Sequence, residues 1–313
     1  MNSPFTEMPP EPLPAHRYSL FGLNFATDRT IPGLAEDEGS DVATVTVAFA
    51  PVPNAIHDPI YCDDTVQASA TEYLFAYPGY LRLYVDGTTK ITVEPLVECD
   101  PSRMWTFLLG ICASIIGFRH GFIPLHAAAV QGHNGCVALA GNSGAGKSTL
   151  AASLCDRGFT LHAEDLCLIQ PANGAHPRVG SGIRELRLWD DAAEALDWTH
   201  RVCCATEPGI PKSVYRLTQA PPVLLPLKRV YALEFHDDDV PKGIHRVHGV
   251  DALQTLIASL RLRPGLLSVG AREQTFASLA SISNTTEVYR FVRPHDRHQL
   301  QAWSERLANH IAA

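Results

Sequence analysis

The stretch that decides the fold is the nonapeptide GNSGAGKST at residues 141–149. It fits the pattern G-x-x-x-x-G-K-[ST] of a phosphate-binding loop (P-loop), the Walker A motif. Its glycines permit backbone angles that other residues avoid, so successive N–H groups can turn inward around an anion. Lys147 can reach the outer phosphates of a nucleotide, and the Ser148 hydroxyl can bind a magnesium ion. We therefore predict that nucleotide phosphates contact Gly141, Asn142, Ser143, Gly144, Ala145, Gly146, Lys147, Ser148 and Thr149.

The residues on either side of the loop support this interpretation. The apolar run 135–140 predicts a buried strand, residues 148–157 predict a helix that ends at Gly158, and 159–162 predict the next strand. The motif thus lies between a strand and a helix, as a phosphate-binding loop requires. The alternative is a glycine-rich turn without a ligand, which this context disfavours.

Two carboxylates close the strand that follows the helix. Glu164 and Asp165 stand 17 and 18 residues after Lys147. A strand–helix–strand unit of this length returns the chain to the same edge of the sheet, so we expect both side chains to face the loop. One acid there can hold Mg²⁺ directly or through water, and a second can accept a proton from an attacking hydroxyl. The alternative is that one of them only caps a turn.

Composition limits the classes of function. The chain has 313 residues, 46% hydrophobic, and a net charge of −8, which argues against a general nucleic-acid binder. Its eight cysteines form no C-x-x-C pair and no zinc spacing, a pattern that suits the cytoplasm. The apolar stretch 104–118 is shorter than the roughly 20 residues needed to cross a bilayer, so we predict a buried helix and no membrane partner.

The chain divides into three predicted parts. Residues 1–16 are rich in proline and predict a loose tail. Residues 17–100 alternate short strand-like runs with turns, which predicts a small antiparallel β-rich domain without chemistry of its own. Residues 101–313 carry the loop. Further along, we expect a turn followed by a strand within 180–189, strands at 228–235 and 288–292, and helices at 252–262, at 271–282 and from Pro294 onward.

Residues 125–165 resemble the catalytic domain of bacterial HPr serine kinase/phosphorylase. The likeness rests on Leu125-His126-Ala127, on the loop, and on the run from Arg157-Gly158 to Glu164-Asp165. It covers roughly residues 120–170 well and weakens toward 290. The resemblance implies an α/β fold with a mixed sheet, like that of phosphoenolpyruvate carboxykinase, and a tendency to form homo-oligomers.

The resemblance also implies roles for particular residues. Glu164 falls on the family's catalytic acid/base aspartate, Asp165 on a metal-side carboxylate, and His126 on a histidine near the site; Ser148 would join Asp165 on the metal. Because the family usually has Asp-Asp here, the division of roles between Glu164 and Asp165 stays open. Residues 182–185 are only weakly similar to the family's phosphorylase region, so we expect a kinase without efficient phosphorylase activity.

Transfer of a phosphoryl group needs positive charge beyond the loop lysine. Any one basic residue is more often exposed to solvent or part of a structural ion pair than part of an active site. Two arginines at a helix end, Arg261 and Arg263, are the most suggestive. The full set of candidates is Arg184, Arg187, Lys212, Arg216, Arg261 and Arg263.

The sequence therefore predicts an ATP- and Mg-dependent kinase that phosphorylates a serine of a peptide or protein, with Glu164, Asp165, His126 and Lys147 as its catalytic residues. Relatives with a β module ahead of such a domain resemble kinases that tailor ribosomally made peptides, including lasso peptides. Two alternatives remain open. One is a nucleotide-binding regulator without transfer, and the other is a kinase for a small metabolite.

Overall fold

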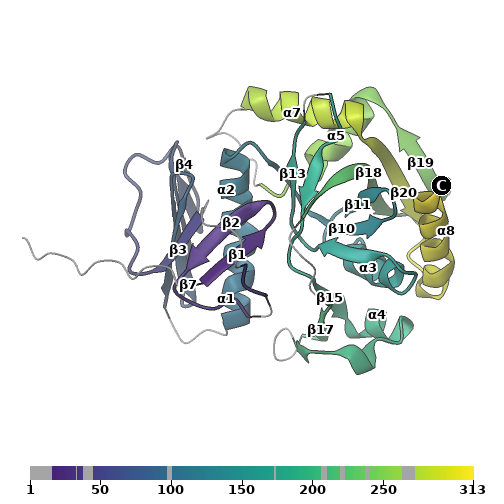
Figure 1. Ribbon diagram of the computed structural model, residues 1–313, viewed down its shortest axis with the longest axis horizontal. Coiled ribbons are helices and arrows are strands. Elements are labelled where there is room, and N and C mark those ends of the chain that lie inside the picture. Colours follow the sequence, from purple (N-terminus) through teal and green to yellow (C-terminus); the bar gives the residue numbers. More distant parts are fainter. Residues whose placement is uncertain are drawn as a thin grey trace, which may run out of the picture.

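The computed structural model describes residues 16–32, 34–37, 45–96, 101–172, 174–205, 210–218, 223–236, 240–262 and 272–313. Figure 1 shows an N-terminal sheet beside a larger part built around a second sheet. The predicted α/β class with mixed sheets is confirmed. The boundaries predicted for the tail and the domains stay predictions, because residues 1–15 and 97–100 lie outside the described ranges.

The N-terminal sheet has the strand order β1-β2-β3-β8-β7-β6-β5-β4. Its strands are β1 (His16–Leu20), β2 (Leu23–Thr27), β3 (Val45–Phe49), β4 (Tyr61–Cys62), β5 (Val66–Ala68), β6 (Glu72–Tyr77), β7 (Leu81–Asp86) and β8 (Lys90–Pro95). The prediction of a purely antiparallel module is wrong at β3, which pairs in parallel with both β2 and β8. The long connection between β2 and β3 is the reason, because a short hairpin would force antiparallel pairing whereas a long crossover permits a parallel strand.

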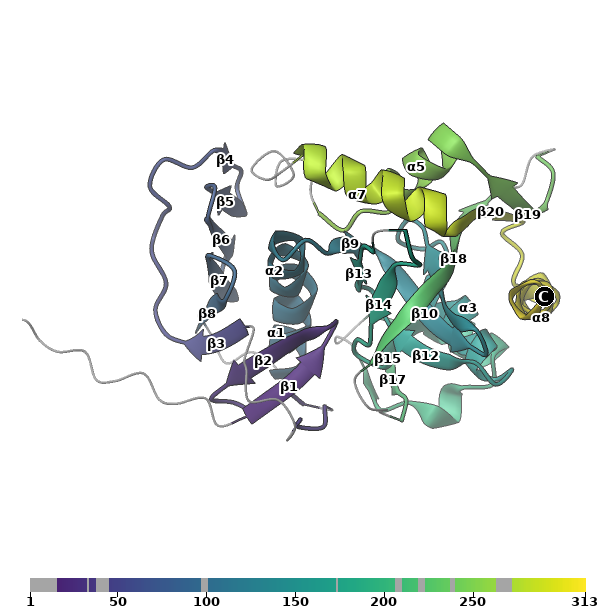
Figure 2. The same ribbon diagram turned by 45° about the horizontal axis from the view of Figure 1, so that its top comes forward.

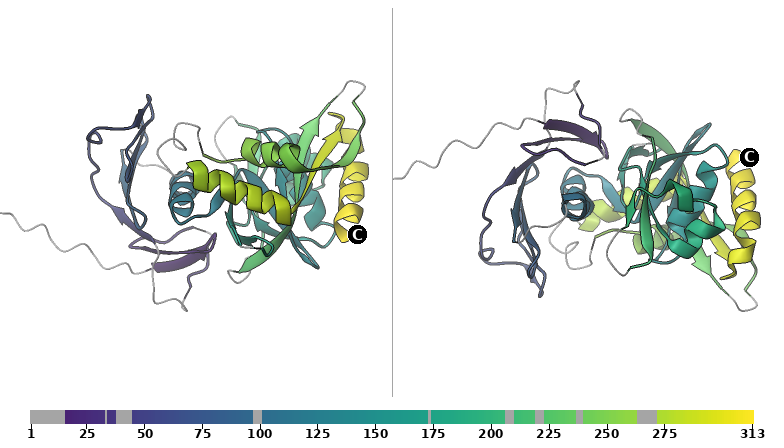
Figure 3. Two further views of the ribbon diagram at one scale, coloured as in Figure 1. Left: turned by 90° about the horizontal axis from the view of Figure 1, so that it is seen from above. Right: turned by 90° about the horizontal axis from the view of Figure 1, so that it is seen from below.

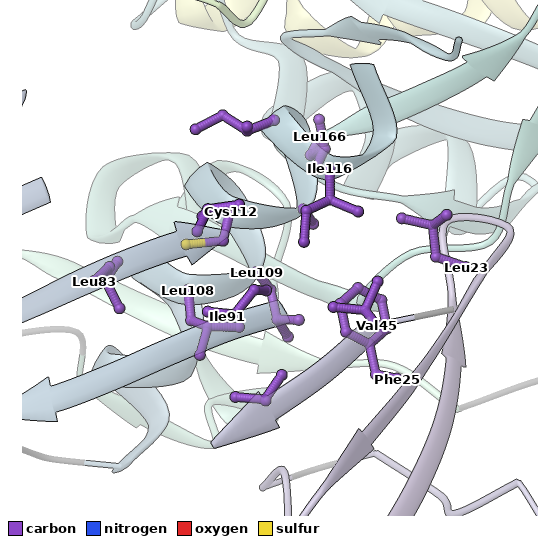
Figure 4. Packing of buried hydrophobic residues seen from close by; sticks show 14 of the residues in the cluster. Leu23, Phe25, Val45, Leu83, Ile91, Leu108, Leu109, Cys112, Ile116 and Leu166 are labelled. Carbon is purple, nitrogen blue, oxygen red and sulfur yellow. The ribbon is translucent and has the colours of Figure 1, made fainter. Parts of the chain in front are cut away.

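One nearly continuous helical segment covers a face of this sheet. It consists of α1 (Pro101–Phe107), a π-helical turn η1 (Leu108–Cys112) and α2 (Ala113–Arg119). Figures 2 and 3 show it between the N-terminal sheet and the rest of the molecule. In Figure 4 its residues Leu108, Cys112 and Ile116 pack with Leu83 of the sheet and with Leu166 of the larger part. The predicted buried helix is confirmed, and its core is shared by both parts of the chain.

The larger part is organised by a nine-stranded mixed sheet. Its main path runs β12-β10-β11-β18-β14-β13-β9, and β20 and β19 continue from β18. The strands are β9 (Ile123–Leu125), β10 (Ala127–Gly132), β11 (Gly135–Ala140), β12 (Thr160–Ala163), β13 (Cys167–Gln170), β14 (Arg178–Gly180), β18 (Leu224–Phe235), β19 (Gly243–Val247) and β20 (Glu287–Arg293). The antiparallel hairpin β10–β11 leads into the loop at residues 141–146.

Helices cover both faces of this sheet because successive strand residues point to opposite sides. Ala128 and Val130 of β10 pack in the cluster that contains α3 (Lys147–Cys155) and α8 (Leu300–Ala312). Their neighbours Ala127 and Ala129 pack in the cluster that contains α5 (Gly249–Ala258) and α7 (Arg272–Thr285). The result is a three-layer arrangement with β10 and β11 buried on both faces.

A small three-stranded sheet lies beside α3. It contains β15 (Glu185–Trp189), β16 (Cys204–Ala205) and β17 (Lys212–Arg216), and it carries α4 (Asp190–Ala195) and η2 (Thr199–Arg201). Figure 1 shows this unit next to the end of α3.

Two predicted helix starts differ from the structure. The helix predicted from residue 252 already begins at Gly249, so Asp251 lies in the first turn of α5. After Pro294 the chain first forms the short η3 (Arg297–Gln299), and α8 begins at Leu300. Among the described residues, no helix is both long enough and apolar enough to cross a membrane.

The hairpin β1–β2 contacts the larger part at Gly180, and this contact yields a prediction. A Cβ atom at Gly180 would overlap the carbonyl carbon of Phe21, whose amide donates a hydrogen bond to the Ser181 carbonyl at 2.6 Å. We expect Gly180→Ala to lower the free energy of unfolding in urea by about 1–3 kcal/mol, because the backbone must shift to admit the methyl group.

The matched control is Gly110→Ala. Its Cβ would meet no atom closer than Arg261 Nη2 at 3.7 Å. We expect a change below about 1 kcal/mol for this control. Equal stabilities of the two variants would contradict the close approach at Gly180.

Candidate active site

The site forms where the carboxyl ends of several strands meet at one edge of the larger sheet. β11 pairs in parallel with β18, and β18 with β20. β10 runs antiparallel to both β11 and β12, so these two strands point in the same direction. The loop at 141–146 and the pair Glu164-Asp165 therefore leave the sheet on the same edge, as predicted, together with Phe235 and Arg293. Ligands of α/β sheets bind at such an edge.

The loop has the backbone form that anion binding requires. Gly144 and Gly146 adopt φ values of +84° and +79°, which residues with a side chain rarely reach. α3 begins at Lys147, and its N-cap Gly146 offers no side-chain cap to the first-turn amides. These amides and the positive end of the helix dipole are available to a phosphate group.

The ammonium of Lys147 is folded back onto its own loop. Nζ donates hydrogen bonds to the carbonyls of Gly141 at 2.8 Å and Asn142 at 3.1 Å. It also lies 3.0 Å from Nε2 of His126. The side chain is only 8% exposed, and burial lowers the pKa of Lys147 although the charges of Glu164 and Asp165 oppose this. Moving Nζ from two carbonyls to a phosphate would give this buried cation an anionic partner.

Glu164 lies against the loop serine. The Ser148 hydroxyl donates a hydrogen bond to Glu164 Oε1 at 2.5 Å. The second oxygen, Oε2, is buried and has no hydrogen-bond partner among the described residues. Burial raises the pKa of Glu164 to about 7, and the Ser148 hydroxyl and the Lys147 charge only partly oppose it. This carboxyl group can thus gain and lose a proton near neutral pH.

Asp165 lies in a different environment from its neighbour. Arg261 binds its carboxylate with both terminal nitrogens, at 2.8 Å and 3.3 Å, and His126 Nδ1 lies 3.2 Å from Oδ1. Burial would raise the pKa of Asp165, but the His126 hydrogen bond and the Arg261 charge lower it to about 2. Asp165 also has a left-handed φ of +64°, which is uncommon outside glycine and asparagine. The two adjacent acids therefore differ strongly in proton affinity.

His126 connects these groups. Strand pairing breaks at this residue: β9 before it pairs with β13, whereas β10 after it pairs with β11 and β12. The His126 amide donates to the Ser259 carbonyl at 2.8 Å, so the residue is held at the break. Its Nε2 lies 3.0 Å from Lys147 Nζ, and its Nδ1 lies 3.1 Å from the Asp165 carbonyl oxygen and 2.9 Å from Arg261 Nη1.

Of the predicted basic residues, Arg261 and Arg187 act on the acidic pair, and the charge of Lys212 helps to lower the pKa of Lys147. Arg261 pairs with Asp165 at 2.8 Å. Arg187 donates to Thr106 Oγ1 of α1 at 2.6 Å, and its charge is one of those that lower the pKa values of Glu164 and Asp165.

The other candidates have different surroundings. Arg184 is buried and donates to the Thr218 carbonyl, and Arg216 forms an ion pair with Glu185 at 2.8 Å. Lys212 lies 5.4 Å from the centre of the Trp189 ring. Arg263 lies outside the described residues.

The residues near Ser148 fit a magnesium ion. Mg²⁺ prefers oxygen ligands and usually takes only one or two protein groups, with water and phosphate oxygens completing its shell. Ser148 Oγ and the Glu164 carboxylate are such donors, and the unsatisfied Glu164 Oε2 provides a free acceptor. Within the described ranges no cluster of three or more His, Cys, Asp or Glu side chains is arranged to hold a metal ion.

The sequence-based prediction missed Arg293 and the aromatic residues beside the loop. Arg293 ends β20, is only 5% exposed and donates a hydrogen bond to the Ala145 carbonyl of the loop. Trp189 and Trp303 lie on the same side of the loop. The only signal for Arg293 in the sequence was its place directly after the strand predicted at residues 288–292. The pairing of β20 with β18, which brings Arg293 to the loop, could not be predicted from the sequence.

The chain was compared with known proteins. No protein-family model matches it, and no curated protein matches it. Among solved structures it is similar to the Hpr(Ser) kinase/phosphatase from Coxiella burnetii, with 12% sequence identity and a TM-score of 0.30 over 60% of this chain and 90% of that chain. A likeness at this TM-score supports no argument of its own, so the function proposed below rests on the geometry of the site.

The raised pKa of Glu164 predicts a pH-dependent stability. The folded chain holds this proton up to about pH 7, whereas the ordinary pKa is 4.5. The stabilisation is therefore complete below pH 4.5 and is lost as the pH rises through 7. Between pH 5 and pH 8, we expect wild type to lose about 2.5 kcal/mol of unfolding free energy relative to Glu164→Gln.

Urea denaturation of both proteins at several pH values measures this difference. The comparison cancels the titration of groups that both proteins share, such as His162, whose pKa burial lowers to about 4. A difference that does not change with pH would contradict the assignment of a neutral Glu164.

Proposed function

We propose that this protein is an ATP- and Mg²⁺-dependent kinase that transfers the γ-phosphoryl group to a serine hydroxyl of a peptide or protein. The observation that carries the proposal is the Glu164 carboxyl group, hydrogen-bonded to the loop serine at 2.5 Å with its other oxygen buried and unsatisfied. A pure nucleotide binder has little need of a proton acceptor at this position. The serine acceptor follows from the resemblance in the sequence.

The loop and Lys147 would hold the phosphates. The amides at the start of α3 surround the phosphate chain, and Nζ of Lys147 leaves the carbonyls of Gly141 and Asn142 for the terminal phosphates. Ser148, with a carboxylate of the pair, would hold Mg²⁺, which neutralises the charge of the phosphates when bound. Asp165 would be the metal-side carboxylate, as the resemblance implies, which leaves Glu164, hydrogen-bonded to Ser148, as the proton acceptor.

Transfer then needs one proton acceptor. The hydroxyl oxygen of the substrate serine forms a bond to the γ-phosphorus while the bond from that phosphorus to the bridging oxygen of ADP breaks, and ADP keeps the electron pair. The proton of the serine hydroxyl passes to Glu164, whose pKa near 7 suits a general base at neutral pH. Asp165 stays ionised and positions Arg261 and His126 beside Lys147.

Removal of the loop lysine should abolish transfer. The assay incubates the protein with MgATP labelled on the γ-phosphate and a degenerate peptide library that has a fixed central serine. A matched library with alanine at that position shows whether the serine is the acceptor. We expect Lys147→Ala to lose at least about 100-fold in rate, because the terminal phosphates lose a buried cation.

The control for this variant is Lys228→Ala, at the opposite end of the sheet next to Gly135. It should keep wild-type activity. Tight binding of MgATP without transfer to any serine library would favour the regulator instead, and a mass shift on a small metabolite would favour the metabolite kinase.

The rate of transfer should depend on pH through Glu164. We expect kcat/KM for MgATP and the serine library to rise with pH and level off above an apparent pKa near 7, because only the ionised carboxylate can accept the proton. Glu164→Gln should lose about 100-fold or more in kcat. A flat profile between pH 5.5 and pH 9 would exclude Glu164 as the base.

A further inference from the structure

A cavity of about 320 Å³ opens beside the phosphate-binding loop, on the side away from Lys147 and Glu164. Gly144, Gly146 and Thr149 form its loop side. Its other walls come from elements far apart in sequence: Trp189 ends β15, Phe235 ends β18, and Trp303 lies on α8. The roles assigned so far to the catalytic residues do not use this cavity.

The direction of a bound nucleotide follows from the loop. Lys147 and Ser148 serve the terminal phosphates and the magnesium ion, and Glu164 lies next to Ser148. The terminal phosphate therefore lies at the end of the loop that holds these groups. The rest of the nucleotide must extend the other way, past Thr149, and the aromatic cavity lies there.

Arg293 supplies a buried cation between the loop and the cavity. Its guanidinium lies 4.1 Å from the centre of the Phe235 ring and donates to the Ala145 carbonyl. Within the described part of the chain no carboxylate pairs with it, and its Nε is buried without a hydrogen-bond partner. A buried charge without a counter-ion is costly, so an anionic ligand here would relieve a cost that the free protein bears.

Gly146 keeps this arginine close to the loop. A Cβ atom at Gly146 would lie only 2.9 Å from Arg293 Nη2. Only glycine at this position lets the guanidinium approach the backbone that surrounds the phosphates. An anion bound by the loop is therefore within reach of Arg293.

The acidic side of the cavity is formed by Asp191 and Asp296. Asp296 already accepts hydrogen bonds from the His298 amide and the Gln299 side chain, each through one carboxylate oxygen. Carboxylates repel phosphate but accept hydrogen bonds from hydroxyl and amino groups. This side thus suits a neutral group with N–H and O–H donors and an apolar ring, which is the chemistry of a nucleoside.

We propose that this cavity binds the nucleoside part of the nucleotide, with the base packed against Trp189 and Trp303 and with Arg293, which lies over the Phe235 ring, on the phosphates nearest the ribose. The proposal rests on the nucleotide binding inferred above and adds its second subsite. Base stacking on aromatic side chains contributes to affinity for any base, so the cavity selects a nucleoside over a bare polyphosphate.

The test compares two ligands that share their phosphates. Isothermal titration calorimetry measures the binding of MgATP and of magnesium tripolyphosphate, which lacks the nucleoside. Wild type should bind MgATP at least about tenfold more tightly than tripolyphosphate. Trp189→Ala should weaken MgATP about tenfold and leave tripolyphosphate within about twofold. Trp189 is 47% exposed, so its removal should leave the fold intact.

Two further variants complete the test. Phe276→Ala removes an aromatic ring of similar exposure, 56%, from α7 outside the cavity, and should change neither affinity. Arg293→Gln should weaken both ligands by a similar factor, because both carry the phosphates that Arg293 contacts. If Arg293→Gln does not fold, the affinities of Trp189→Ala still show whether the nucleoside binds in the cavity.

The outcomes separate the two proposals. If wild type binds both ligands equally, or if Trp189→Ala leaves MgATP affinity unchanged, the nucleoside cavity is wrong while the phosphate-binding loop stands. If wild type binds neither ligand, the nucleotide-dependent function itself is wrong and the cavity proposal falls with it. Loss of MgATP affinity alone in Trp189→Ala supports the cavity.

Discussion

The position of β10 between β11 and β12 is the constraint on which the site depends. β10 runs antiparallel to both neighbours, so β11 and β12 must point the same way although a helix separates them in sequence. The loop after β11 and the acids after β12 therefore meet at one sheet edge, close enough for Ser148 to donate to Glu164. A sheet in which β12 paired elsewhere would leave the same residues without this contact.

Buried ionisable groups without full compensation gather at this edge. Lys147 rests on backbone carbonyls, Glu164 retains a proton to about pH 7, and Arg293 has no carboxylate partner within the described residues. Such groups raise the free energy of the protein without a ligand, because a charge buried away from water is costly unless it has a partner. The protein thus maintains a set of donors and acceptors whose partners are those a phosphate chain with its metal ion and a hydroxyl would supply.

The helical segment α1–η1–α2 links the N-terminal sheet to this edge. One face lies in the core that it shares with that sheet. From the same segment, Thr106 accepts a hydrogen bond from Arg187, and Gly110 lies against Arg261. Both arginines act on the acidic pair, so the packing of the N-terminal sheet bears on the position of charges in the site. The π-helical turn at Leu108–Cys112 is part of this contact.

The sequence by itself determined the local features. The loop, the strand before it and the helix after it follow from glycine, lysine and hydrophobic spacing, and the placement of Glu164-Asp165 at the end of a strand follows from the same pattern. Tertiary structure decided which distant residues join them. Arg261, Arg293 and the aromatic residues of the cavity lie more than 80 residues from the loop or belong to a separate small sheet. In the same way, β3 pairs in parallel with β2, which the local pattern did not predict. The reason is physical: backbone propensity and periodicity act over one element, whereas strand pairing depends on competition among many segments for the same sheet edge.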